Sequence, residues 1–344
     1  MRAKKALPSS SIPRLVTIFC LLLLAFLGSS CSRSGGPSRS VLVLGFREGI
    51  AGRERNSLLD YGCRKAGSEL GLETELVVPG PWEGADAYAR PEDPSLWMLL
   101  SCGEEPAAGG NLSRDGSPVS HTVILDYPGN SVPPGGEGNA YIRYRVEEGA
   151  YLCGFLAGRL TSGSDHPLVN RLPVVAFIGC AGDPRTARYQ TGFVRGALAA
   201  NPQVNPLSYL VGDCRDEAQG SAFAQDAARK GADIVFCTPG DFSDGVLRAA
   251  QSLGLLVILA GSDRSAESPS HVLTSLILRD DNALFRAVYL ALRDELRPGL
   301  QEWGVREGVW ALAPFRGHDV YIRRELKEAL AVEEEKVADM KLSP

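Results

Sequence analysis

Residues 173–261 read PVVAFIGCAGDPRTARYQTGFVRGALAANPQVNPLSYLVGDCRDEAQGSAFAQDAARKGADIVFCTPGDFSDGVLRAAQSLGLLVILAG. This stretch holds four short apolar runs: PVVAFIG, LSYLVG, ADIVFCT and LLVILAG. Between them lie three segments in which apolar residues recur three and four positions apart, the pattern of a helix packed on a sheet. Apolar strands that alternate with amphipathic helices are typical of a parallel sheet with crossover helices. The stretch therefore predicts an α/β fold.

The same alternation extends in both directions from this stretch. Further strands are expected over residues 40–46, 73–79, 122–126 and 308–314, and further helices from near Asn56 to residue 70, over 147–160 and over 320–337. Segments 79–95, 103–120 and 127–140 are rich in Gly, Pro and Ser and have no period, so they are expected to be loops. Loops at the carboxyl ends of parallel strands are where such sheets bind ligands.

Composition excludes several classes of function. The chain has 344 residues, a length that suggests two domains, and 36 Lys and Arg stand against 41 Asp and Glu without a basic stripe. Nucleic acid is therefore a poor partner. The sequence contains no GxSxG, P-loop, HExxH or CxxC motif, so it predicts no enzyme, no metal site and no cofactor.

The N-terminus has the pattern of a secretory signal. Four basic residues, Arg2, Lys4, Lys5 and Arg14, precede the 13-residue apolar run over 15–27. That run is shorter than the roughly 20 residues that a spanning helix needs. The small residues in LGSSC, which ends at Cys31, resemble the lipobox of bacterial lipoproteins, although Gly28 stands where a branched residue is usual.

The lipobox resemblance implies three features of the mature protein. Residues 1–30 would be removed, Cys31 would be acylated, and residues 31–40 would form a flexible Gly- and Ser-containing tether to the membrane. The six later cysteines fall mostly inside expected helices or strand ends. We expect them to be buried free thiols, with disulfides as the less favoured alternative.

Five strings in series carry a family resemblance: EEGAYLCGFLAG from residue 147, VAFIGC from 175, YQTGFVRGALAANP from 189, GADIVFCTPG from 231 and VLTS from 272. Together they resemble the basic membrane protein family, lipoprotein substrate-binding components of ABC transporters whose better-known members bind purine nucleosides. The resemblance implies the type I periplasmic binding-protein fold, with two Rossmann-like lobes joined by three crossovers. Lobe 1 is then expected over 41–128 and 262–300, and lobe 2 over 129–261 and 301–344.

The resemblance also implies ligand contacts. The family's Asp-Lys-Ser-Phe-Asn motif, in which the Phe stacks on the base and the Asn bonds its edge, aligns with GRERN over 52–56, and only Asn56 is kept. Asn56 could instead cap a helix. Arg55 replaces the stacking aromatic and could stack, face solvent or pair with an acid.

Other positions match the family's site one by one. Asp126 falls where the family has a base-contacting aspartate, with an Asx-turn as the alternative. Tyr189 falls where the family has its second aromatic, with core packing as the alternative. Gly240, at a strand end, would let the backbone approach a ligand or serve packing alone.

The last part of the expected site holds the sugar. Asp263 matches a Gly-x-Asp aspartate whose carboxylate would accept hydrogen bonds from a vicinal diol such as ribose. The family's lysine after VLTS is replaced by Leu278, with Arg279 next to it as a possible substitute. Losing that lysine together with the stacking phenylalanine indicates a changed ligand or weaker binding.

These features predict a lipid-anchored substrate-binding protein that captures a nucleoside-like ligand and serves an ABC permease. The alternative is a diverged lipoprotein of the same fold with a signalling or surface-interaction role outside transport.

Overall fold

The computed structural model describes residues 39–46, 50–79, 96–102, 119–161, 163–340 and 342. These belong to one compact unit, Arg39–Pro344. The expected signal, Cys31 and most of the expected loops at 79–95 and 103–120 lie outside the described residues. No helix within the described ranges is long and apolar enough to cross a membrane.

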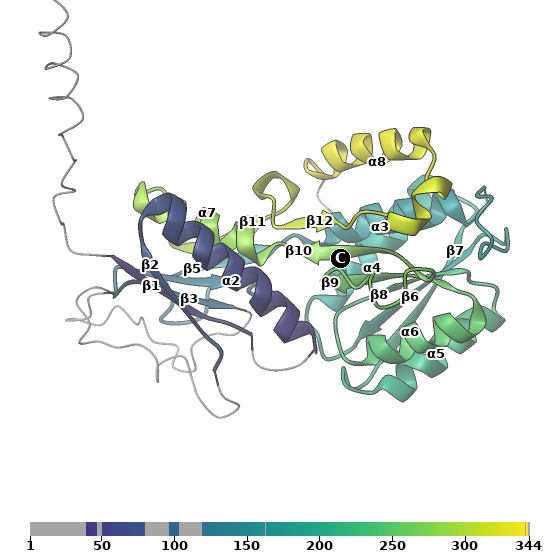
Figure 1. Cartoon of the computed structure of the whole chain (residues 1–344), viewed down its shortest axis with the longest axis horizontal. Helices are drawn as coiled ribbons and strands as arrows, with labels where there is room; N and C mark the ends of the chain where they lie inside the picture. The colour runs from purple at the N-terminus through teal and green to yellow at the C-terminus, as the bar shows by residue number, and fades with distance from the viewer. Residues whose placement is uncertain are drawn as a thin grey trace, which may run out of the picture. The chain divides into compact units, whose positions relative to one another are not determined.

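The first lobe is built on a six-stranded parallel sheet (Figure 1). In spatial order its strands are β11 (Gly299–Trp303), β5 (Ala140–Tyr144), β4 (His121–Leu125), β3 (Leu96–Cys102), β1 (Ser40–Leu44) and β2 (Glu73–Val77). Helices α2 (Ile50–Leu70) and α7 (Asp280–Leu292) belong to this lobe and touch at Gly62. A Cβ at Gly62 would lie 2.9 Å from the Cα of Asp281, so the two helices can approach this closely only with glycine there.

The second lobe is built on another six-stranded sheet, parallel except for its edge strand β12. In spatial order its strands are β12 (Trp310–Leu312), β10 (Val272–Leu278), β9 (Leu256–Gly261), β8 (Ile234–Cys237), β6 (Val174–Cys180) and β7 (Asn205–Val211). Its helices are α3 (Val146–Leu160), α4 (Thr186–Ala200), α5 (Glu217–Arg229), α6 (Phe242–Leu253) and α8 (Arg324–Val337).

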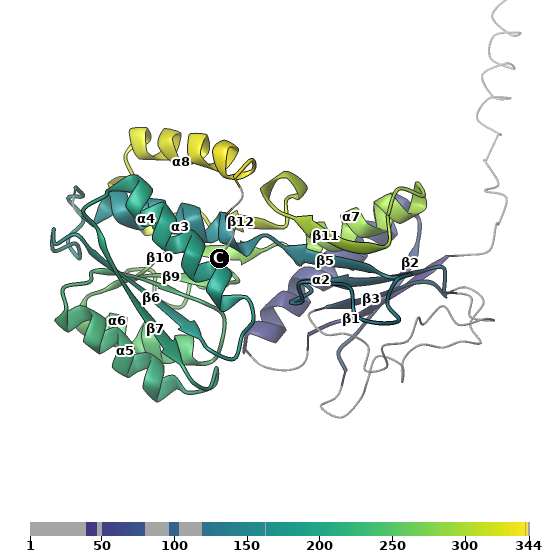
Figure 2. The same ribbon diagram turned by 180° about the vertical axis from the view of Figure 1, so that it is seen from behind.

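The helices of the second lobe cover both faces of its sheet. Helices α3 and α4 lie side by side on one face, and α5 and α6 lie on the other (Figure 2). Glycines bring α3 and α4 together, because a Cβ at Gly154 would meet the Phe193 carbonyl oxygen at 2.0 Å and a Cβ at Gly196 the Tyr151 carbonyl oxygen at 1.9 Å. Helix α8 joins α3 through a 2.8 Å hydrogen bond from the Tyr151 hydroxyl to Glu333.

Three crossovers join the lobes, at different places from those expected. The chain passes from β5 to α3 at Arg145, from β10 to α7 at Arg279, and from β11 to β12 over residues 304–309. The expected boundaries were 128, 261 and 300. The first two boundaries lie later in the sequence than expected because of β5 and β10, two strands that we did not predict. The strand β5 adds to the sheet of the first lobe before the chain leaves it, and β10 does the same in the second lobe.

The cysteine expectation is wrong for one pair. Cys180 and Cys214 form a disulfide, with Cα atoms 5.3 Å apart. Parallel pairing of β6 with β7 places Cys180 opposite Val211, three residues before Cys214, and so brings together thiols that are 34 positions apart in sequence. Cys63, Cys102, Cys153 and Cys237 are free and buried, as expected.

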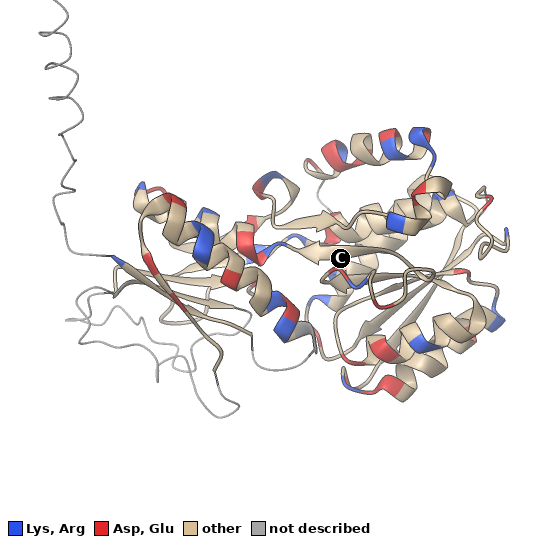
Figure 3. Cartoon of the chain, viewed as in Figure 1, with Lys and Arg blue, Asp and Glu red and all other residues tan. Residues whose placement is uncertain are grey.

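Charges of both signs are interspersed along the outer helices. In Figure 3, α2 and α8 each carry acidic and basic residues rather than a stripe of one sign. Pairs one turn apart, Arg64 with Asp60 and Arg324 with Glu328, neutralise one another on these helices. The arrangement agrees with the absence of a basic stripe in the sequence.

Candidate functional site

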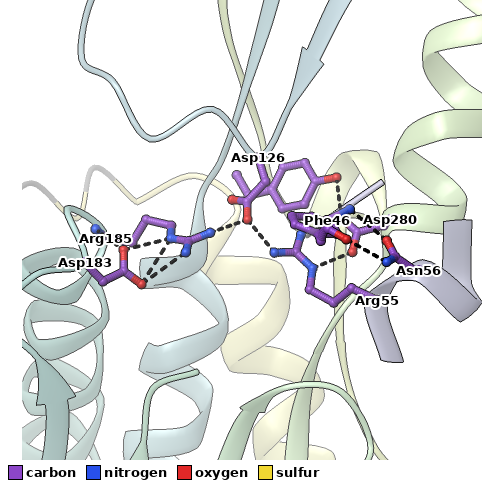
Figure 4. A network of polar contacts seen from close by, with 8 residues as sticks. Phe46, Arg55, Asn56, Asp126, Asp183, Arg185 and Asp280 are labelled. Carbon is purple, nitrogen blue, oxygen red and sulfur yellow. Dashed lines mark hydrogen bonds and ion pairs between the residues drawn. The ribbon is translucent and has the colours of Figure 1, made fainter. Parts of the chain in front are cut away.

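Arg55 is the centre of a buried ion-pair cluster in the first lobe (Figure 4). Its Nε and Nη2 donate to the two carboxylate oxygens of Asp280, both at 2.6 Å, and its Nη1 donates to Asp126 Oδ2 at 2.7 Å. The three residues come from α2, from the residue after β4 and from the first turn of α7. The structure therefore selects acid pairing among the roles that the sequence left open for Arg55.

The residue next to Arg55 anchors the end of β1. Asn56 donates from Nδ2 to the Phe46 carbonyl oxygen and accepts at Oδ1 from the Phe46 amide, both at 2.7 Å. Helix α2 begins at Ile50, so Asn56 lies inside it and is not the cap that the sequence allowed. This pairing fixes Phe46, whose ring centroid lies 3.8 Å from the Arg55 Cζ, in a cation–π contact.

Asp126 connects the two lobes. It is 1% exposed, and its Oδ2 accepts from Arg55 of the first lobe and from Arg185 of the second. Arg185 stands immediately before α4 and is also held by Asp183, with Nε to Oδ1 at 2.9 Å and Nη2 to Oδ2 at 3.1 Å. Asp126 Oδ1 is buried and has no hydrogen-bond partner among the described residues.

The electrostatics of Asp126 keep it ionised. Burial acts to raise the pKa of this carboxyl, but the charges of Arg185 and Arg55 outweigh burial and lower the pKa below its usual range. The buried carboxylate has one oxygen saturated by two guanidinium groups and the other without a donor. Such an oxygen is a strong acceptor for a ligand that enters between the lobes.

A second contact between the lobes lies beside a small cavity. The Ser262 hydroxyl, just after β9, donates to Glu54 of α2. The cavity has a volume of about 10 Å³, roughly enough for one water molecule. The lining residues are Glu54, Pro239, Gly240, Ser243, Ala260, Gly261, Ser262 and Arg264. This cavity is too small for a ligand of nucleoside size.

The other predicted site residues are placed differently. Gly240 lines this cavity, and its φ of +150° suits glycine. Tyr189 is fully buried and packs near Phe236, with ring centroids 6.0 Å apart, and its hydroxyl has no hydrogen-bond partner within the described part of the chain. Tyr189 therefore has the core packing that the sequence left open.

Asp263 and Arg279 are engaged with neighbours outside the Arg55 cluster. Asp263 Oδ1 accepts from the amide and hydroxyl of Ser265, at 3.0 and 2.6 Å, and its Oδ2 accepts from Arg316 at 2.7 Å. Arg279 pairs with Asp281 at 2.9 and 2.7 Å. The structure thus brings Arg55, Asn56 and Asp126 together and gives these two residues contacts of their own.

Sequence reasoning missed five members of the cluster, namely Phe46, Tyr144, whose hydroxyl donates to Asp280 at 3.0 Å, Asp183, Arg185 and Asp280. Asp280 stands next to Arg279, which we did single out, and a buried arginine in the place of an aromatic requires an acid somewhere. Arg185 and Asp183 lie in the loop after β6, at the carboxyl edge where ligands bind. The acid next to Arg279 and the loop after β6 were therefore two local signals in the sequence that pointed to these residues.

A family model described as ABC transporter substrate-binding protein PnrA-like matches residues 138–342. The chain belongs to this family. The family is one of substrate-binding proteins and not of enzymes, and it agrees with the resemblance found in the sequence.

Curated relatives are basic membrane proteins of Borrelia and Borreliella species. Basic membrane protein D of Borreliella burgdorferi is 27% identical over 42% of this chain and 40% of its own length, and protein B of that species is 26% identical over 58% of each. In these alignments the chain spans about half the length of the relatives. Basic membrane protein A2 of Borrelia garinii is 23% identical over 86% of this chain and 85% of its own.

Solved structures confirm the predicted fold. A solute-binding protein of an ABC transporter system from Conexibacter woesei superposes with a TM-score of 0.65 at 14% identity, over 89% of this chain and 99% of its own. One from Aeropyrum pernix gives 0.63 at 15% identity, over 87% and 91%. These likenesses show that the chain has the type I periplasmic binding-protein fold, with two α/β lobes.

Replacing Arg55 by Met tests the ion-pair cluster. The change leaves the buried carboxylates of Asp126 and Asp280 without their shared guanidinium, and we expect it to lower the free energy of unfolding by about 3–5 kcal/mol at neutral pH. The loss should shrink as the pH falls toward about 4, because the Asp280 carboxyl, left without a guanidinium partner, then takes up a proton in the folded state, whereas Asp126 keeps Arg185. Urea unfolding at several pH values measures both effects.

Arg53→Met is the matched control, because Arg53 lies on the same helix and is exposed. It should change stability by less than about 0.5 kcal/mol. Equal stabilities for the two variants would show that the Arg55 cluster does not hold the first lobe together.

Proposed function

We propose that this protein captures a small polar ligand between its lobes, outside the cytoplasm, and delivers it to an ABC permease, with a nucleoside as the first candidate. Membership of the PnrA-like family and the two-lobed fold support this role. The observation that carries it is the buried Asp126 carboxylate between the lobes, whose Oδ1 has no donor among the described residues.

The crossovers support a hinge at one side of that site. The Arg145 amide donates to the Trp303 carbonyl at 2.8 Å, and the Arg279 amide donates to the Val309 carbonyl at 2.8 Å. The first crossover is thus hydrogen-bonded to the end of β11, and the second is hydrogen-bonded to the third. Bending at these few residues would separate the lobes while both sheets stay intact, as in other hinged proteins.

The arrangement favours a ligand recognised by its hydrogen-bond donors more than by stacking. Phe46 is covered by Arg55, and Tyr189 is fully buried. The expected diol contact through Asp263 requires the ligand to replace Arg316 and Ser265 on that carboxylate. Recognition of the base edge by Asp126 requires only an open Oδ1 and the departure of Arg185.

Calorimetry with a panel of purine and pyrimidine nucleosides tests the ligand proposal, after mass spectrometry of any small molecule that co-purifies. Asp126→Asn should weaken binding by about 1.5–3 kcal/mol, because it replaces a charged acceptor by a neutral amide of similar shape. Asp213→Asn, at an exposed aspartate outside the site, should leave affinity unchanged. A wild-type chain that binds no nucleoside and carries no small molecule would favour the role outside transport.

We also propose that the protein is anchored to the membrane through a lipid on Cys31. The support lies in the sequence alone: the basic N-terminal residues, the apolar run over 15–27 and the small residues before Cys31. A lipid at this position would hold the lobes near a permease by the tether over residues 31–40.

Metabolic labelling with a radioactive fatty acid tests the anchor. Cys31→Ser should abolish incorporation of label, because it removes the thiol that is acylated. Cys20→Ser, within the apolar run, is the matched control and should keep the label. Retention of the full label by Cys31→Ser would rule the anchor out.

A further inference from the structure

The contact between Arg185 and Asp126 joins two residues that each keep a partner in their own lobe. Arg185 is bonded to Asp183 through two nitrogens, at 2.9 and 3.1 Å, and Asp126 is bonded to Arg55 at 2.7 Å. When the lobes separate, neither residue becomes an unpaired charge. Breaking this contact therefore avoids the large cost of an isolated buried ion, and the contact can open and close.

The same contact covers the acceptor that the proposed ligand needs. Arg185 approaches Asp126 Oδ2, while Oδ1 is buried without a donor in the described ranges. Once Arg185 withdraws, both oxygens can take further donors, and a carboxylate binds a planar group with two adjacent N–H donors in a bidentate manner. The guanidinium of Arg185 is itself a group of that kind.

The charge of the first lobe also favours ligands that carry hydrogen-bond donors. Without Arg185 the cluster consists of one guanidinium, Arg55, and two carboxylates, Asp126 and Asp280. An excess negative charge in a buried place attracts donors and cations and disfavours groups that present only acceptors.

We propose that Arg185 competes with the ligand for the Asp126 carboxylate, so that it closes the empty protein and sets which ligands are accepted. This inference rests on the proposed function. Ligands with two adjacent hydrogen-bond donors, such as the N1–H and 2-amino group of guanosine, replace Arg185. Ligands with an acceptor next to their donor, such as the corresponding edge of adenosine, leave Arg185 in place.

The distance between the lobes of the ligand-free protein tests the closing role. Spin labels on unnatural amino acids at Ser57 of α2 and Leu253 of α6, both exposed, leave the native cysteines untouched. Pulsed electron paramagnetic resonance on the full chain in detergent then gives the distribution of distances. We expect Arg185→Ala to shift this distribution to longer distances, and millimolar guanidinium chloride to restore the short ones, with sodium chloride as the salt control.

Arg215→Ala is the matched control. Arg215 pairs with Asp213 two positions earlier, with Nε and Nη2 as donors, as Arg185 does with Asp183. It is exposed, and within the part of the chain that the structure describes it forms no hydrogen bond or ion pair with Asp126. It should give the wild-type distribution. A wild-type distribution for Arg185→Ala would overturn the closing role.

Calorimetry with guanosine and adenosine tests the competition itself. Arg185→Ala should bind guanosine severalfold more tightly than wild type and should narrow the preference for guanosine over adenosine. Unchanged affinities in a chain that binds guanosine would overturn the competition. If no nucleoside binds to wild type or to Arg185→Ala, the nucleoside assignment fails, and the distance measurement alone decides whether Arg185 closes the empty protein.

Discussion

The two lobes share one buried carboxylate, that of Asp126, which accepts from a guanidinium on each side. A buried charge is tolerated only when it is paired and hydrogen-bonded, so the position of Asp126 constrains everything around it. Arg55 must stay in the first lobe, Asp280 must complete the pairing of Arg55, and Asn56 fixes Phe46 against the Arg55 guanidinium. The site is therefore an electrostatic network more than an aromatic clamp.

The fold could be predicted where apolar patterns are continuous. Strands β6, β8 and β9 are buried runs and were found within two residues of their ends, and α4 lies in the first of the three segments that were expected to be helical. Strand β5 was missed because its five residues follow a loop rich in Gly and Pro. Helix α7 carries apolar residues at helical spacing, with Ala283, Leu284, Ala287 and Val288 buried, so its signal was present in the sequence and was not used.

The site could be predicted only in part, because its pairs join distant positions. Family resemblance indicated Arg55, Asn56 and Asp126, and the structure places these three together. The partner of Arg55 lies 225 positions away, and Arg185 lies 59 positions from Asp126. No local pattern encodes pairings of that kind, which arise when α2, α7 and the start of α4 meet at the strand ends. The replacement of an aromatic by Arg55 becomes intelligible once both carboxylates are seen.

A crystal structure of the protein with its bound ligand would test most directly whether Asp126 is the shared acceptor. The account predicts that the ligand's donors contact both oxygens of Asp126, that Arg55 keeps its bonds to Asp126 and Asp280, and that Arg185 is bonded to Asp183 alone. A ligand bound elsewhere, with the contact between Arg185 and Asp126 intact, would contradict it.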